Sequence, residues 1–521
     1  SGVGRGRTMW QRFTLNDVRT IGHYLGVLIL FLAAAMAVPF VVALAFQEWK
    51  PAANYLLSIG ISLILGSALR LLRVAPARLS RRQALAVTGF AWIVLAVMAA
   101  IPLYMSGHFN RFVDALFEGV SGLTTTGASL VVDLDHLSLA DNVWRFMMIL
   151  LGGLGLIVVA LALGLFGKRS GASLYTSEGR SDHLVPNVVQ TTQFIAKFAL
   201  LFILAATCIL TVVLTFAGIE PVRAAFHSVC LSITAFMTGG FTPMSQSVVY
   251  YHSFPLEVVL MLLMLAGSIS FTLHAELRKG RIGAFFRDIE VRTLIIWLAV
   301  ATCVMAASLS VSLSFNDLPP MLRRGVFMVV SSFSTTGLQN ITTNQLAGVF
   351  SSGAFIALAV LMAVGGSAGS TTGGLKLLRM GIMAKSIVST IREALAPDSA
   401  RVAVTYYRLG RRRVSADIVK EAMTVFVLYV STYTIGALVG IAHGYDAMQA
   451  IFESVAMASN GGLTSGLVAP DMPITLELFY IFEMWAGRLE FVTLLALLVE
   501  VVVSVLPAKL RNRPRKQGVW Q

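Results

Sequence analysis

Four short stretches of the chain combine small polar residues with glycine, a combination suited to holding a dehydrated cation. They begin at four separate points and read FEGVSGLTTTGAS from Phe117, CLSITAFMTGGFT from Cys230, FMVVSSFSTTGLQ from Phe327 and FESVAMASNGGLT from Phe452. A bare cation needs a ring of backbone carbonyls in place of its water shell. Glycine permits the unusual dihedrals that turn such carbonyls inward.

The four stretches are copies of one unit, because each has a glycine ten positions after its first residue. One such run alone is typical of a close helix crossing. Four copies instead predict a selectivity filter with pseudo-fourfold symmetry, in which a half-helix directs its negative dipole end at the cation. The predicted carbonyl ligands belong to Thr125, Thr126, Gly127, Ala128, Thr238, Gly239, Gly240, Phe241, Thr335, Thr336, Gly337, Leu338, Asn460, Gly461, Gly462 and Leu463.

A second glycine-rich stretch, GGSAGSTTGG over residues 365–374, interrupts the apolar segment after the third filter copy. A continuous helix is poor there, because each glycine disfavours helix. We expect a broken span that acts as a gate below the filter, and the alternative is a fixed helix kink. The predicted gate residues are Gly365, Gly366, Ser367, Gly369, Gly373, Gly374, Lys376 and Arg488.

The surrounding chain has the composition of an integral membrane protein. Of its 521 residues, 56% are hydrophobic and 13% are charged, which is too apolar for a water-soluble domain. Segments such as 24–46, 84–103, 200–217 and 422–442 each approach the roughly 20 apolar residues that cross a bilayer. The fold class predicted is an all-α polytopic membrane protein.

Clusters of Lys and Arg in residues 70–82, 168–180, 278–292, 376–413 and 509–516 are predicted to face the cytoplasm, as are both termini. About ten transmembrane helices result: two extra N-terminal spans, then four repeats of span, pore loop and span. We predict six divisions of the chain. Residues 1–19 form a cytoplasmic N-terminus, of which residues 1–7 resemble an expression remnant, and residues 20–83 form the two additional helices. The first three repeats cover 84–180, 181–289 and 290–400, and 401–521 form the fourth repeat with a basic C-terminus.

The remaining residues exclude several other classes of protein. The net charge of +14 is confined to loops between spans, so nucleic acid binding is a poor interpretation. The three cysteines have no metal-ligand spacing, and the chain has no nucleotide-binding glycine motif. A membrane-embedded enzyme is disfavoured because no catalytic cluster is present. Between the filter glycines and the next helices there is no Lys or Arg, whereas Asp133, Asp135, Asp141 and Asp471 would concentrate cations there.

The four filter copies and the stretch 365–374 resemble those of the TrkH/KtrB branch of the Trk/Ktr/HKT superfamily of K+ transporters. The resemblance covers nearly the whole chain, and it is strongest to TrkH. The resemblance implies K+ uptake through the bacterial cytoplasmic membrane, a homodimer, and a cytoplasmic nucleotide-binding regulatory ring of the TrkA/KtrA type. In the plant branch a serine in place of the first filter glycine accompanies Na+ preference. Gly127 is present here, which favours K+.

Arg488 and Glu490 lie in the apolar final repeat, where a charge requires a partner or water. They form either a pair that locks two helices together or, as the resemblance implies for the arginine, a cation that projects below the filter. A K+ symporter coupled to Na+ or H+ is the alternative to channel-like conduction. Such a symporter would need a second site with ionisable groups at mid-membrane, and apart from this pair the sequence offers few of them.

Overall fold

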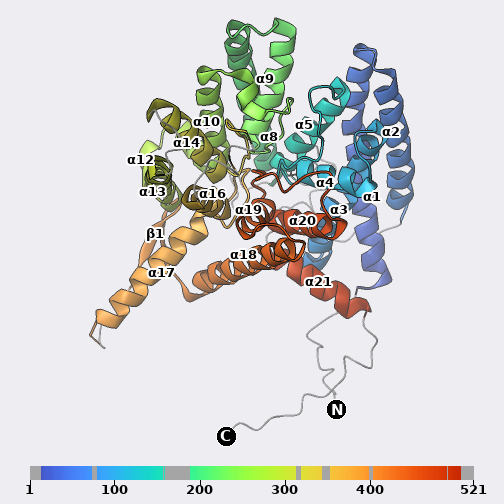
Figure 1. The fold of residues 1–521 in the computed structure, drawn as a ribbon. Helices are drawn as coiled ribbons and strands as arrows, with labels where there is room; N and C mark the ends of the chain where they lie inside the picture. The colour runs from blue at the N-terminus through green and yellow to red at the C-terminus, as the bar shows by residue number, and fades with distance from the viewer. Residues whose placement is uncertain are drawn as a thin grey trace, which may run out of the picture.

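The computed structural model describes residues 13–72, 79–155, 158, 188–311, 318–342, 346, 352–397, 403–489 and 491–505. Within these ranges the chain is almost entirely helical, and one short hairpin is its only sheet (Figure 1). Glu490, the basic loop 168–180 and the basic C-terminal residues 509–516 lie outside the described residues. The all-α polytopic membrane fold is confirmed.

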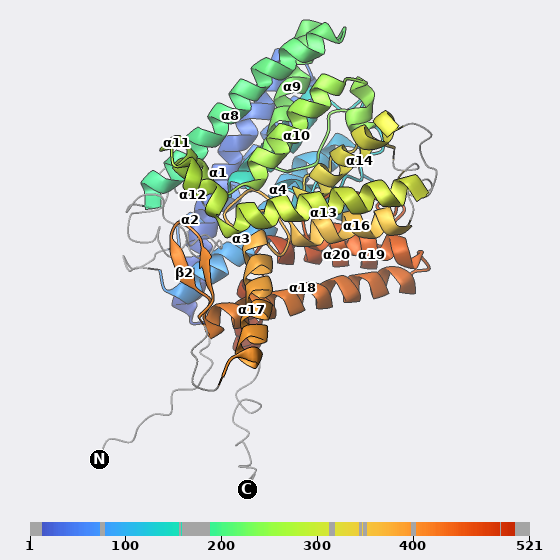
Figure 2. The same cartoon turned by 90° about the vertical axis from the view of Figure 1, so that its left-hand side faces the viewer.

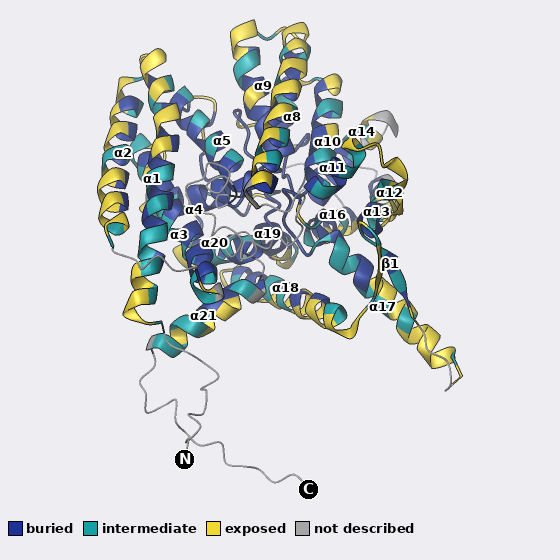
Figure 3. Cartoon of the chain, turned by 180° about the vertical axis from the view of Figure 1, so that it is seen from behind, coloured by how far each residue is buried: buried dark blue, intermediate teal, exposed yellow. Residues whose placement is uncertain are grey.

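Six described helices are long and apolar enough to cross a membrane. Two precede the repeats, and each of the four repeats begins with one. They are α1 (Leu15–Ala45), α2 (Trp49–Arg70), α3 (Arg81–Ser106), α8 (Val188–Phe216), α13 (Ile289–Val311) and α18 (Ala416–Ala442). Their outer faces carry many exposed apolar residues, as expected of surfaces in contact with lipid (Figure 3).

Each repeat continues with a short pore helix and a short second helix. The pore helices are α4 (Phe112–Leu123), α9 (Pro221–Phe236), α14 (Leu318–Phe333) and α19 (Ala447–Ala458). The second helices are α5 (Leu139–Leu154), α10 (Phe254–Ser268), α16 (Ser352–Val364) and α20 (Ile474–Arg488). Each pore helix packs against the first helix of its own repeat, so each repeat forms a compact unit.

All four second helices end after 13 to 16 residues, which is too short to cross a membrane as one helix. In repeats two to four a further helix follows: α11 (Phe271–Arg278), α17 (Leu377–Leu395) or α21 (Phe491–Val505). The pair α10 and α11 is bent by 101°. We expected a break in repeat three alone. By length and hydropathy, the described helices include six clear spans, or seven if the bent pair counts as one.

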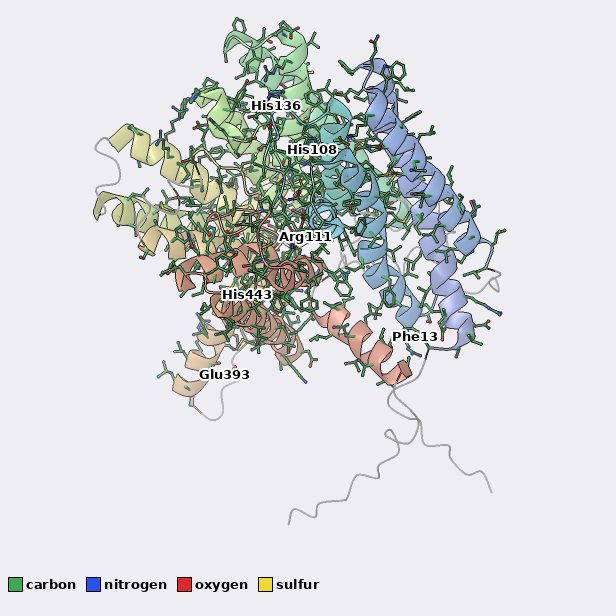
Figure 4. All side chains as sticks on the ribbon, turned by 45° about the vertical axis from the view of Figure 1, so that its right-hand side comes forward. Phe13, His108, Arg111, His136, Glu393 and His443 are labelled. Carbon is green, nitrogen blue, oxygen red and sulfur yellow. The ribbon has the colours of Figure 1, made fainter. Side chains whose placement is uncertain are left out.

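Helix α17 projects away from the body of the protein, and the hairpin of β1 (Thr405–Tyr407) and β2 (Arg411–Arg413) lies beside it (Figure 2). Between α11 and α13 lies the short α12 (Ile282–Arg287), and η1 (Ser247–Tyr251) follows the second filter loop. The first and last described segments meet, since the backbone N–H of Phe13 donates to Ser504 Oγ at 3.0 Å (Figure 4). Both ends of the described chain therefore lie next to each other.

Candidate ion-conduction site

The four pore helices all end with the same backbone motif. In each, an N–H three residues beyond the helix donates to the carbonyl five residues earlier: Thr126 to Ser121 at 2.8 Å, Gly239 to Thr234 at 2.8 Å, Thr336 to Ser331 at 3.0 Å and Gly461 to Ala456 at 2.7 Å. This bond is the long one of a Schellman motif, which satisfies carbonyls at a helix C-terminus. Each pore helix therefore stops at the same point, with its negative dipole end at the filter.

The motif requires a left-handed residue two positions beyond the last residue of the helix, and here none of the four is glycine. Thr125, Thr238, Thr335 and Asn460 have φ of 58°, 52°, 51° and 54°. Two positions later the filter glycines Gly127, Gly240, Gly337 and Gly462 have φ of 84°, 75°, 87° and 60°. Left-handed and ordinary residues thus alternate in each loop, a backbone pattern that turns successive peptide groups toward one side.

The four filter loops contact one another in a closed ring through their glycines. Figure 3 shows buried loops at the centre of the molecule. The spacing is shown by where an added Cβ would fall. On Gly127 it would lie 2.3 Å from the carbonyl oxygen of Gly239, and on Gly240 it would lie 2.4 Å from that of Thr336. The corresponding distances are 2.7 Å from Gly337 to Gly461 O and 1.9 Å from Gly462 to Thr126 O. Each loop therefore contacts the next, and the fourth contacts the first.

The filter side chains of repeats one and three are alike, and those of repeats two and four differ from them. In repeat one the hydroxyls of Thr124 and Thr126 lie 2.8 Å apart, and in repeat three those of Ser334 and Thr336 lie 2.7 Å apart. In repeats two and four, glycine replaces the second hydroxyl of the pair. The filter is therefore not fourfold symmetric in its side chains.

Two of the predicted carbonyl ligands also accept hydrogen bonds from side chains of the protein. Ser121 Oγ donates to the Ala128 carbonyl and Ser331 Oγ donates to the Leu338 carbonyl, both at 2.6 Å. One lone pair of each oxygen is thereby used inside the protein. The carbonyls of Thr126, Gly239, Thr336 and Gly461, which lie at the contacts between loops, are the better candidates for an ion-binding ring.

A buried arginine fixes the first two filter loops to each other. Arg145 of α5 donates from Nε to Glu118 Oε1 at 2.8 Å, and both side chains are fully buried. The same guanidinium donates to the carbonyl of Thr242 at 3.2 Å and stacks on the Phe241 ring, 4.1 Å from its centroid. Glu118 also accepts from the N–H of Leu130 at 3.1 Å. This arginine therefore joins a pore helix, its own loop and the loop of the next repeat.

Ion pairs hold two further seams between repeats. Arg323 of α14 forms a bidentate pair with Glu257 of α10, at 2.9 Å and 2.6 Å. Arg111, just before α4 and near the middle of the molecule in Figure 4, lies 3.0 Å from Glu477 of α20. These pairs join repeat two to repeat three and repeat four to repeat one.

The glycine-rich stretch between α16 and α17 forms the expected break and lies directly against the filter. Gly365, Gly369 and Gly374 have φ of 66°, 76° and 76°. Thr238 Oγ1 donates to Thr371 Oγ1 at 3.1 Å, and the N–H of Gly373 donates to Thr335 Oγ1 at 2.9 Å. The break therefore contacts the left-handed filter residues of repeats two and three.

The two predicted gate cations lie beside this stretch. Lys376 has φ of 80° and its ammonium donates back to the carbonyl of Thr372. Arg488 donates to the carbonyl of Thr371 at 3.2 Å, to that of Gly152 in α5, and to Thr125 Oγ1 at 3.5 Å. Its partners thus come from repeats one and three. A pair between Arg488 and Glu490 lies outside the described residues.

At the outer face the acidic residues divide into two groups. Asp133, Asp135 and Asp471 are exposed, and a hydrogen bond from His136 lowers the pKa of Asp133, so its carboxylate stays negative. Asp141 is buried, where it accepts from Tyr55 at 2.8 Å and from Ser138 at 2.7 Å. Our expectation was wrong for Asp141, because this residue lies in the first turn of α5 and bonds the side chains around it.

Sequence reasoning missed a second set of glycines, at the ends of the second helices. An added Cβ on Gly152, Gly267 or Gly487 would lie 1.8, 2.1 or 2.0 Å from the last carbonyl of the pore helix in the same repeat. These carbonyls belong to Leu123, Phe236 and Ala458. A glycine 25 to 27 residues after the filter glycine in repeats one, two and four was the available signal. Within the described residues no group of His, Cys, Asp and Glu could hold a metal ion.

Comparisons with known proteins agree over almost the whole length of the chain. The TrkH family model, described as a cation transport protein, matches residues 52–504. An uncharacterized cation transporter of Methanocaldococcus jannaschii is 30% identical over 95% of this chain and 98% of its own length. The potassium uptake protein TrkH of Escherichia coli K12 is 29% identical, over 92% and 98%. The crystal structure of the potassium transporter TrkH from Vibrio parahaemolyticus superposes with a TM-score of 0.78 at 25% identity, over 92% and 98%.

Proposed function

The chain belongs to the TrkH family of cation transport proteins, and on that premise we propose that it takes up K+ through the ring formed by its four filter loops. The observation that carries this proposal is the cyclic contact of the loops, each glycine against a carbonyl of the next repeat. Alternating left-handed residues present main-chain oxygens along such a ring. Backbone carbonyls in a ring replace the water shell of a K+ ion.

Conduction in this proposal is channel-like, with residues 365–376 as the gate. The gate stretch contacts the filter residues Thr238 and Thr335, and the cation Arg488 donates to its backbone. A movement of this stretch would therefore change the filter and the position of a positive charge together. In this proposal the exposed aspartates concentrate cations at the outer end, and Arg488 places a positive charge beside the gate stretch on the other side of the filter.

The regulatory partners implied by the resemblance, a second copy of the chain and a cytoplasmic nucleotide-binding ring, belong to the same proposal. The hairpin carries Arg411, Arg412 and Arg413, and all three are exposed. It lies beside α17, which begins directly after the gate stretch. A partner bound to this basic surface would thus be connected to the gate through one helix.

The test is ion flux into proteoliposomes of the purified protein, comparing K+, Rb+, Na+ and Li+ for wild type and Gly127→Ser. We expect wild type to prefer K+ and Rb+. The serine side chain would press on the Gly239 carbonyl and lower the K+/Na+ flux ratio by about tenfold, which equals about 1.4 kcal/mol.

Gly218→Ser is the matched control. Gly218 also has a positive φ, of 94°, but an added Cβ there meets no atom within 4 Å. This variant carries the same backbone strain without contact to a filter loop, and it should keep the wild-type ion preference. Equal exclusion of all four ions by wild type, or an unchanged ratio in Gly127→Ser, would contradict the proposal.

A further inference from the structure

A carboxyl group with no cationic partner is buried in the fourth repeat. Glu483 of α20 is 0% exposed, and its Oε1 accepts from Ser454 Oγ of α19 at 2.7 Å. Gly436 of α18 makes room for it, because a Cβ there would lie 2.2 Å from Glu483 Oε1. Among the described residues, the other carboxyl oxygen, Oε2, has no hydrogen-bond partner. The group is therefore enclosed by three helices of one repeat.

Other polar groups turn toward the same place without partners of their own. The hydroxyl oxygens of Tyr433 on α18 and Tyr480 on α20 are buried, and within the described part of the chain neither makes a hydrogen bond. Both phenols interact electrostatically with Glu483. The nearby Glu453 of α19 uses one oxygen for Thr464 and Ser465, and its other oxygen is unpartnered among these residues.

The charged groups of α4 and α21 are paired elsewhere, and those of α18, which are Asp417, Lys420 and Glu421, are exposed in its first two turns. On α4, Asp114 pairs with Arg111 and Glu118 pairs with Arg145; on α21, Glu500 pairs with Arg82. On α18, Tyr429 donates to the carbonyls of Gly374 and Gly487. Arg488, on α20 itself, donates to backbone of repeats one and three. No ion pair within the described ranges reaches Glu483.

An ionised carboxylate in such a place costs far more than a neutral carboxyl group, because neither water nor a cation compensates its charge. We propose that Glu483 is a proton-binding site and that its bound proton maintains the fourth filter loop. The neutral form removes the charge from this enclosed place and keeps the hydrogen bond from Ser454. When the proton leaves to solvent, the negative charge stays on Glu483 and must recruit water or a cation from outside the repeat.

Two contacts connect this carboxyl group to the filter. Ser454, its hydrogen-bond partner, lies on the pore helix α19, which ends two residues before Asn460. Met484, the next residue of α20, accepts from Asn460 Nδ2 at 2.9 Å through its carbonyl. The same amide nitrogen donates to Thr126 Oγ1 of the first filter loop at 3.0 Å. A displacement of Glu483 would therefore reach the filter through both α19 and α20.

The proton is tested by infrared spectroscopy of the whole protein in lipid, which requires no ion flux. We expect wild type to show a protonated carboxyl C=O band at neutral pH that Glu483→Gln lacks. Glu257→Gln is the matched control, because Glu257 also lies on a second helix but forms a bidentate pair with Arg323. If the band is the same in wild type and Glu483→Gln, the proton site is refuted.

The link to conduction rests on the proposed function and is tested separately by K+ flux in proteoliposomes between neutral and alkaline pH. Wild type should lose most of its flux at the alkaline end. Glu483→Gln, which imitates the neutral carboxyl group, should conduct with little dependence on pH. A variant that keeps the wild-type pH dependence would overturn the link to the filter, whereas loss of all K+ flux from wild type at every pH would instead count against the proposed function.

Discussion

At the scale of single residues, the glycines that end the second helices are as closely confined as those of the filter. Gly152 lies against the carbonyl of Leu123, the last residue of the first pore helix, and a Cβ would be 1.8 Å from that oxygen. Backbone atoms cannot rotate out of the way as a side chain does. The position therefore accepts no larger residue unless α5 moves away from α4.

We predict that Gly152→Ala destabilises the protein by about 1–3 kcal/mol, the usual cost of overpacking. The measurement is the thermal unfolding midpoint in detergent, with K+ flux as a second readout. Gly60→Ala is the control, because Gly60 lies in α2 and an added Cβ there meets nothing within 4 Å. A midpoint for Gly152→Ala equal to that of the control would show that the close contact has no energetic weight.

The residue scale also shows where sequence reasoning stops. The filter glycines were identifiable because glycine is the residue that tolerates positive φ. The same conformation occurs at Thr125, Thr238, Thr335 and Asn460, but these residue types do not predict it. The Schellman bond at the helix end imposes it. Glu483 was missed for another reason: its isolation depends on the packing of α18, α19 and α20, which no local pattern encodes.

At the scale of elements, the interaction of Arg145 with Glu118 joins α5, α4 and the second filter loop. We predict that Arg145→Gln destabilises the protein by about 3–5 kcal/mol, because it leaves the carboxylate of Glu118 buried without a cation. It should also lower the K+/Na+ flux ratio. The double variant Arg145→Met with Glu118→Leu removes both charges.

That double variant separates the two effects of the arginine. Its thermal midpoint should return toward wild type, because no unpaired charge remains. Its ion preference should stay impaired, because the contacts to Thr242 and Phe241 are still missing. If Arg145→Gln alone keeps both the wild-type midpoint and the wild-type flux ratio, the arginine does not position the loops.

The gate stretch is the second element whose role can be tested directly. Deleting residues within 365–374 should raise K+ flux in the absence of any regulatory partner, because the stretch no longer obstructs the pathway. Thr371→Val is a milder change that removes the hydroxyl bonds to Thr238, Phe236 and Gly267. It should raise flux to a smaller extent.

Thr424→Val is the control for the milder variant, since within the described residues the hydroxyl of Thr424 on α18 bonds its own helix, at the carbonyl of Lys420, and the residue lies outside the cavity described below. It should leave K+ flux unchanged. Unaltered and still regulated flux in the deletion variant would remove the gate from the proposal.

The helices themselves were predictable to different degrees. Hydropathy identified α1, α2 and the first helix of each repeat, because these are continuous apolar runs. Hydropathy did not predict the breaks in the second helices of repeats two and four. There the apolar sequence continues past Ser268 and Arg488 although the helix stops. Only the five glycines of residues 365–374 made a break visible in composition.

At the scale of the whole molecule, the four repeats meet at four seams that are not alike. Arginines hold three of them: Arg145 between repeats one and two, Arg323 between two and three, and Arg111 between four and one. The described residues of the seam between repeats three and four contain no such pair. They line a cavity of about 350 Å³ instead.

The cavity lies beside both ends of the gate stretch. Val364 ends α16, Leu375 lies two residues before α17, and both line the cavity together with Trp297, Phe426 and Phe452 of neighbouring helices. The cavity is lined mostly by apolar side chains, and helices that face each other across it have fewer packing contacts, so they can approach or separate at lower cost. Since the other seams are fixed by ion pairs, we infer that motion of the gate takes place at this one.

Filling the cavity should therefore oppose gating while it stabilises the fold. Ala359 of α16 is buried and lines the cavity. We predict that Ala359→Leu raises the free energy of unfolding by about 1 kcal/mol and lowers K+ flux, yet leaves the K+/Na+ ratio intact because the filter is untouched. Ala357→Leu, on the same helix but outside the lining, should change neither flux nor ratio. Wild-type flux in a stabilised Ala359→Leu protein would mean that the seam between repeats three and four stays closed during conduction, and that the gate moves without it.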